Sequence, residues 1–169
     1  IGALVDELYS AVRLPYEGHN YAMAAIMPSG NFADFEMGLT ASELEQILSD
    51  LQSSSAMVDL SMPKFQAQTS ISLADQLASL GMPDAFDSAK ADFSGMTGSR
   101  ELMIGSILHQ ATIDVNEEGT EAAAATMVGM SLTSMPGQSF TIHFDKPFIY
   151  VIYETTTNAV VFMGRVVNP

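Results

Sequence analysis

The sequence lacks cysteine and tryptophan and contains few basic residues. Its 169 residues hold 6 Lys and Arg against 20 Asp and Glu, for a formal net charge of -14 at pH 7. The absence of cysteine excludes a disulfide framework and a thiolate metal site. Nucleic acids and anionic membranes are bound by clustered Lys and Arg, so we expect neither as a partner.

Long hydrophobic runs are also missing. No stretch reaches the roughly 18 apolar residues of a membrane-spanning helix, and no signal peptide is recognisable. The chain opens at Ile1 rather than at a methionine. It is nevertheless 47% hydrophobic, which is enough to bury a substantial core, and its length fits about one domain.

Apolar alternation predicts several strands and two helices. A capping box formed by Thr40 and Glu43 begins a helix that ends at residues 53–55, and a short helix runs from near Ser72 to Gly81. Strands are predicted at residues 8–15, 21–27, 57–62, 66–69, 102–116, 140–144, 148–154 and 160–167. These elements predict an α+β fold.

Motifs of known enzyme sites are absent from the sequence. There is no Gly-x-Ser-x-Gly nucleophile elbow, no zinc-binding His pair and no calcium loop, and the carboxylates are scattered. His109 shares one strand face with Ala111, Ile113 and Val115. A lone His in that position is typical of a core residue rather than a catalyst. We therefore expect neither an enzyme nor a cofactor.

Residues 117–139 form a predicted loop of unusual composition. After Glu121 the segment holds small residues with almost no charge, and its even positions become apolar toward the end. A loop this long inside a compact domain is usually functional or disordered. Its alternation is that of a strand with one buried face. The segment is therefore a candidate two-state element, a loop that can become a strand.

Four segments resemble the serpin family: Phe93–Met96, Asn116–Thr126, Phe144–Phe148 and Phe162–Pro169. The resemblance covers nearly all of this chain but only about the second half of a serpin. It implies that residues 1–169 are the C-terminal portion of a single serpin domain with large mixed and antiparallel sheets. The N-terminal half of the same serpin is then an expected partner, and an extracellular location is implied.

The resemblance also implies a mechanism, suicide-substrate inhibition of a serine-type protease. The loop at about 117–139 is cut by the target and its hinge then inserts into the main sheet as a strand. Thr120 is the first inward-facing residue of that strand. The hinge residues are Glu117, Glu118, Gly119, Thr120, Glu121, Ala122, Ala123, Ala124, Ala125 and Thr126.

The position of the cut follows from counting along the loop at the family's spacing. From Glu117 the count gives the bond between Thr133 and Ser134, with Leu132–Thr133 as the runner-up. Counting backward from Phe144 gives a later bond, near Met135–Pro136. Residues 119–145 contain no Arg or Lys, so elastase-like or subtilisin-like proteases are expected as targets rather than trypsin-like ones.

Two further residues match family positions. His109 matches a buried histidine of the family, in the region where the main sheet opens to admit the loop. Lys64 and Glu117 match two family positions whose side chains pair across neighbouring strands. The alternative for Lys64 is a simply solvated side chain. Two other functions stay open: a non-inhibitory serpin that acts as a carrier or chaperone, and an independent binding module with an exposed loop.

Overall fold

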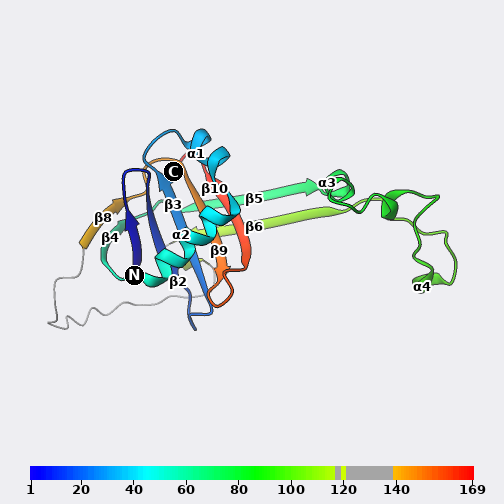
Figure 1. Cartoon of the computed structure of the whole chain (residues 1–169), viewed down its shortest axis with the longest axis horizontal. Coiled ribbons are helices and arrows are strands. Elements are labelled where there is room, and N and C mark those ends of the chain that lie inside the picture. The colour runs from blue at the N-terminus through cyan, green and yellow to red at the C-terminus, as the bar shows by residue number, and fades with distance from the viewer. Residues whose placement is uncertain (117–118, 121–138) are drawn as a thin grey trace. The chain divides into compact units, whose positions relative to one another are not determined.

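The computed structural model describes residues 1–116, 119–120 and 139–169 (Figure 1). This part of the chain forms two compact units. The first unit comprises Ile1–Phe65 and Asp114–Pro169, and the second comprises Gln66–Ile113. No helix in the described residues is long and apolar enough to cross a membrane.

The first unit is built on an antiparallel sheet with the order β1-β2-β3-β9-β10. Its strands are β1 (Gly2–Val5), β2 (Tyr9–Pro15), β3 (Tyr21–Pro28), β9 (Phe148–Glu154) and β10 (Val160–Val166). The turn between β2 and β3 has positive φ angles at Gly18 (79°) and His19 (59°). Antiparallel pairing of β2 with β3 confirms the predicted hairpin, and the left-handed conformation of these turn residues is one that short hairpin connections use.

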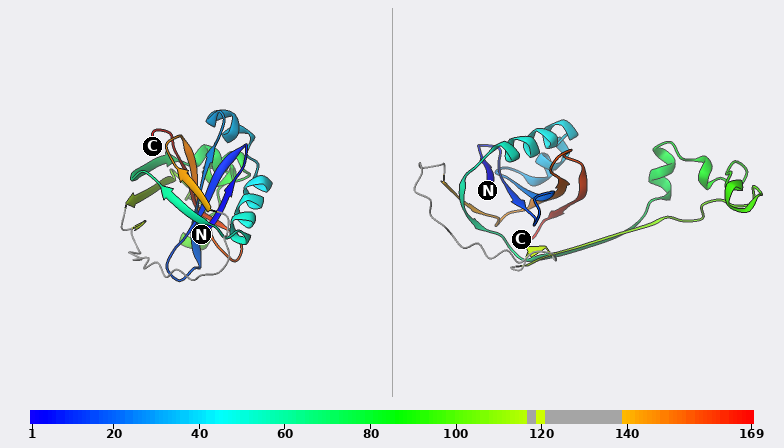
Figure 2. Two further views of the ribbon diagram at one scale, coloured as in Figure 1. Left: turned by 90° about the vertical axis from the view of Figure 1, so that its left-hand side faces the viewer. Right: turned by 90° about the horizontal axis from the view of Figure 1, so that it is seen from below.

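Two helices, α1 (Phe32–Gly38) and α2 (Ala41–Ser53), cover one face of this sheet (Figure 2). The predicted capping box at the start of α2 is present, since the Thr40 hydroxyl accepts from the Glu43 amide and the Glu43 carboxylate accepts from the Thr40 amide. The buried residues that α2 and the sheet bring together are Ala11, Ala22, Ala24, Ile26, Ile47, Leu48, Leu51, Ile149, Val151 and Tyr153. Their spacing of three and four along α2, and of two along the strands, is what one-sided burial requires.

The other face of the sheet carries aromatic residues. Phe148 and Tyr150 alternate with the residues that face α2, and Phe65 packs on both, with ring centroids 5.7 and 5.3 Å apart. Phe144 adds an edge-to-face contact with Phe148 at 5.1 Å. Strands β4 (Met57–Ser61) and β8 (Ser139–His143) pair in parallel just before Phe65 and Phe144.

The second unit contains most of β5 (Phe65–Ser72) and β6 (Leu108–Asn116), with α3 (Ala74–Ser79), the 3-10 turn η1 (Asp84–Phe86) and α4 (Ser94–Thr97) between them. The predicted strand at 102–116 begins at Leu108, so its first six residues are not a strand. The helical spacing of Leu73, Leu77 and Leu80 predicts that all three point inward, but Leu80 is 83% exposed. The helix is only six residues long, and Leu80 lies just beyond its end, where the chain turns at Gly81.

Candidate functional site

The candidate site begins where β6 ends. After Asn116 the chain returns as β7 (Gly119–Thr120), which pairs antiparallel with β6. The register places Thr120 opposite Val115 and Gly119 opposite Asn116. β7 is the edge of a sheet with the order β5-β6-β7, so the two described hinge residues lie as a strand beside β6.

The residues of β6 that precede the hinge show one-sided burial. Ile113 is 7% exposed and Val115 is half-buried, whereas Asp114 and Asn116, which alternate with them, are exposed. The predicted alternation is therefore present at this end of the strand. Thr120 thus takes the register position opposite a residue on the buried face of β6.

The remaining hinge residues and the predicted cut lie outside the described residues. These are Glu117, Glu118, Glu121, Ala122, Ala123, Ala124, Ala125, Thr126, Thr133 and Ser134. The pairing expected between Lys64 and Glu117 lies outside them for the same reason. Lys64 itself is exposed and sits in the short connection between β4 and β5.

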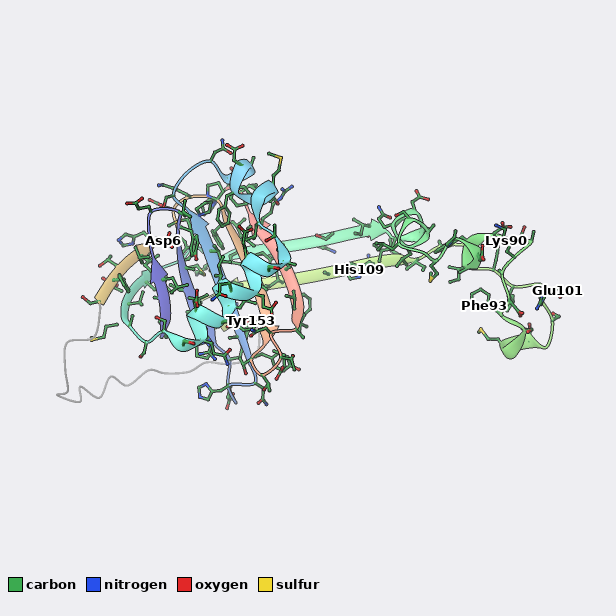
Figure 3. The ribbon with its side chains drawn as sticks, in the orientation of Figure 1. Asp6, Lys90, Phe93, Glu101, His109 and Tyr153 are labelled. Carbon is green, nitrogen blue, oxygen red and sulfur yellow. The ribbon has the colours of Figure 1, made fainter. Side chains whose placement is uncertain are left out.

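His109 lies near the start of β6 in the second unit (Figure 3). It is exposed, although it shares a strand face with buried Ile113. The burial that the resemblance implies for His109 is thus not provided by this chain, and a buried role stays a prediction.

The segment Phe93–Met96 begins α4, and a polar network fixes it. An Asp92 carboxylate oxygen accepts from the Ser94 amide at 3.1 Å, and Arg100 approaches the other oxygen at 2.7 Å. Hydrogen bonds from Ser94, and to a smaller extent the Arg100 charge, lower the pKa of Asp92. The network stabilises a turn; we see no chemistry for it, and no group of His, Cys, Asp and Glu in the described residues could hold a metal ion.

Two features of the first unit were not predicted from the sequence. Helix α1 and the pocket that it helps to form, between α1, α2, β2 and β3, were not predicted. Asn31 is the signal that could have indicated α1, because its side chain accepts from the Asp34 amide as an N-cap.

Comparison with known proteins places the chain in a family. It matches the family described as "Serpin (serine protease inhibitor)" over residues 4–169. It is 38% identical over 161 residues to a serine protease inhibitor of Cyanea capillata, and 35% identical over 175 residues to human leukocyte elastase inhibitor. These alignments cover 94% and 99% of this chain, and 42% and 46% of the relatives.

Solved structures show the same fold. The thermophilic serpin tengpin in its native state is similar with a TM-score of 0.73 and 29% identity, over 99% of this chain and 44% of that one. The chain therefore belongs to the serpin family. It spans less than half the length of the relatives that it matches.

Proposed function

We propose that this chain is the C-terminal part of an inhibitory serpin that traps a serine-type protease as a suicide substrate. The observation that carries the proposal is the antiparallel pairing of Gly119 and Thr120 with the end of β6. A strand that starts in this place can be extended, residue by residue, along the edge of β6 that no other described strand occupies. The segment that would extend it, residues 121–126, is Glu followed by four Ala and Thr.

The proposed reaction begins at the loop. The protease's serine oxygen attacks the carbonyl carbon of Thr133, the bond to the Ser134 nitrogen breaks, and the amine leaves with a proton. Thr133 is then esterified to the protease. Insertion of the hinge beside β6 moves the attached protease away from the cut end and distorts its active site before water can release it.

The driving force for insertion is the completion of a sheet. Each inserted residue makes backbone hydrogen bonds, and buried apolar surface contributes about 25 cal/mol per Å². Small side chains at 122–125 suit a strand that must enter between neighbours. A charge at an inward position would oppose insertion, because a buried, unpaired charge costs several kcal/mol.

The target is proposed from the loop and from a relative's name. The absence of Arg and Lys from residues 119–145 disfavours trypsin-like proteases, and one relative is named leukocyte elastase inhibitor. We infer an elastase-like or subtilisin-like target and an extracellular site of action. The chain itself acts as an inhibitor and not as an enzyme.

The proposed partner within the same protein is an N-terminal half. Within the described residues β10 is an edge strand that pairs only with β9. Its apolar side chains are 41% to 53% exposed at Val160, Val161, Phe162 and Met163. An apolar edge strand of this kind is an aggregation hazard unless another segment covers it.

The test is to incubate the full-length protein with elastase, subtilisin, chymotrypsin and trypsin in turn. An SDS-stable complex with elastase or subtilisin is the expected result. Cleavage of the loop by every protease with no stable complex would contradict inhibition and favour the carrier or chaperone alternative.

A further inference from the structure

A pocket of about 560 Å³ lies in the first unit, apart from the hinge. It is bounded by the start of β2, the end of β3, α1 and the first turns of α2. Its apolar lining includes Leu8, Tyr9, Phe35, Leu39 and Ile47. Its volume falls within the range of roughly 300–1,000 Å³ that holds small organic ligands.

The aromatic wall of the pocket is formed by Tyr9 and Phe35. Their ring centroids are 6.0 Å apart and the rings are tilted by 58°. Leu8, which also lines the pocket, is 70% exposed. A large apolar side chain is therefore exposed to solvent next to the aromatic wall. A ligand with a flat apolar body would bury these surfaces.

The polar groups around the pocket are held in place by hydrogen bonds. The Tyr9 amide donates to an Asp6 carboxylate oxygen at 2.9 Å, and the Asn31 side chain accepts from the Asp34 amide at 3.1 Å. The Glu43 carboxylate accepts from the Thr40 amide and from the Thr40 hydroxyl, both at 2.8 Å. The site is therefore largely formed before any ligand arrives.

The charge on the lining has a single sign. Glu7 and Glu43 line the pocket, whereas none of the chain's Lys or Arg residues does. The hydrogen bonds from Thr40 lower the pKa of Glu43, so this carboxylate stays ionised at neutral pH. Asp6 and Asp50 are close enough to Tyr9 to add to burial in raising the pKa of its phenol.

An anion is the alternative ligand at the start of α2, because helix N-termini attract negative charge. The protein's own Thr40 and Glu43 side chains already accept hydrogen bonds at this helix N-terminus. Glu43 accepts from the Thr40 amide, and Thr40 in turn accepts from the Glu43 amide at 3.3 Å. The charge that a ligand would meet is the carboxylate of Glu43.

We propose that this pocket binds a small organic cation of the arylalkylamine class, with its aromatic body on the Tyr9–Phe35 wall and its ammonium group toward Glu7 and Glu43. An aromatic body gains from contact with the two rings, and an ammonium near aromatic faces and carboxylates is favoured electrostatically. The site is separate from the protease-trapping hinge, so the proposal does not depend on the proposed function.

The test uses three probes with one indole body and different charges: tryptamine, tryptophol and indole-3-propionate. Isothermal titration calorimetry on the full-length protein is expected to show the tightest binding for tryptamine, weaker binding for tryptophol and none for indole-3-propionate. Equal binding of the three probes, or no binding of any, would overturn the proposal; the second result means that another segment fills the pocket.

Matched variants assign the binding to this pocket. Glu7→Gln and Glu43→Gln are each expected to weaken tryptamine about two- to five-fold, the range of a solvent-exposed ion pair, with tryptophol unchanged. Glu43→Gln keeps the capping pair, since Gln serves in the same position. Glu45→Gln is the control, because Glu45 is on the same helix, is exposed and does not line the pocket.

A steric variant gives an independent readout. A Cβ added at Gly30, which lines the pocket, meets no atom within 4 Å, so Gly30→Leu is expected to occupy the space and abolish both tryptamine and tryptophol binding. Circular dichroism verifies that the variant is folded. Unchanged tryptamine binding in folded Gly30→Leu, or in the double variant Glu7→Gln/Glu43→Gln, contradicts the proposal.

Discussion

The ring of Tyr150 in β9 lies against the backbone of Gly164 in β10, its direct partner in the register. A Cβ placed on Gly164 would overlap the Tyr150 hydroxyl and would lie 2.9 Å from ring atom Cε1. Tyr150 is also packed on Phe65 at 5.3 Å and is 6% exposed. The ring therefore has little freedom to move, and lack of space explains the glycine.

Gly164→Ala should destabilise the protein by about 1–3 kcal/mol, because overpacking forces side chains and backbone to shift. Urea denaturation of the full-length protein measures the change. The cost should fall in a Tyr150→Ala background, where the space is free. Gly105→Ala is the control, since a Cβ there meets no atom within 4 Å; equal costs at Gly105 and Gly164 would contradict the steric explanation.

The capping box should make stability depend on pH. Hydrogen bonds from the Thr40 amide and then the Thr40 hydroxyl lower the pKa of Glu43 in the folded state. The contribution of the Glu43 carboxylate is thus complete above the ordinary pKa of a glutamate and is lost as pH falls through the lower, folded value. The stability difference between the parent and Glu43→Gln, followed by urea denaturation, should change over that acidic window and stay constant above it.

Thr40→Ala tests the other half of the same capping box. Loss of an N-cap hydroxyl should cost about 0.5–2 kcal/mol at neutral pH. Thr156→Ala, in the exposed turn between β9 and β10, is the matched control. A cost no larger than that of the control would mean that α2 is held by its apolar face alone.

Local patterns predicted the first unit well. Apolar runs bounded by turn residues predicted β2, β3 and β9 to within about a residue, and Thr40 with Glu43 marked the start of α2. These signals depend on neighbours in sequence, so they survive without knowledge of the fold. Helix α1 was missed because it is seven residues long and buries none of them fully, which leaves no clear apolar period.

Features that depend on distant contacts were predicted less well. The residues before Leu108 have strand-like composition but do not form a strand. The pocket beside Tyr9 could not be predicted, because its walls come from segments that only the tertiary fold brings together. The hinge was the opposite case: its composition indicated a strand-forming loop, and the register of Gly119 and Thr120 is compatible with that hypothesis.

Thr120→Arg should leave the full-length protein folded but convert it from an inhibitor into a substrate. Thr120 is opposite Val115 in the register. Val115 shares its face of β6 with Ile113, which is buried. A charge at this register should stall insertion, so that water releases the protease first. The stoichiometry of inhibition measures the change, with Thr156→Arg as the control. Full complex formation by Thr120→Arg would rule out insertion at this register.

The cut site gives the last prediction. If hinge spacing fixes the position, Thr133 enters the protease's primary pocket. A small β-branched side chain suits a shallow apolar pocket and leaves a deep anionic pocket unsatisfied. Elastase should then be trapped and trypsin hardly at all, and Thr133→Arg should shift inhibition toward trypsin.

Mass spectrometry of the released C-terminal fragment identifies the bond directly. A fragment that begins at Ser134 supports the count from the hinge, and one that begins at Thr133 moves it by one residue. A fragment that begins at Pro136 means that the distance to Phe144 sets the position, and the specificity argued from Thr133 is then wrong.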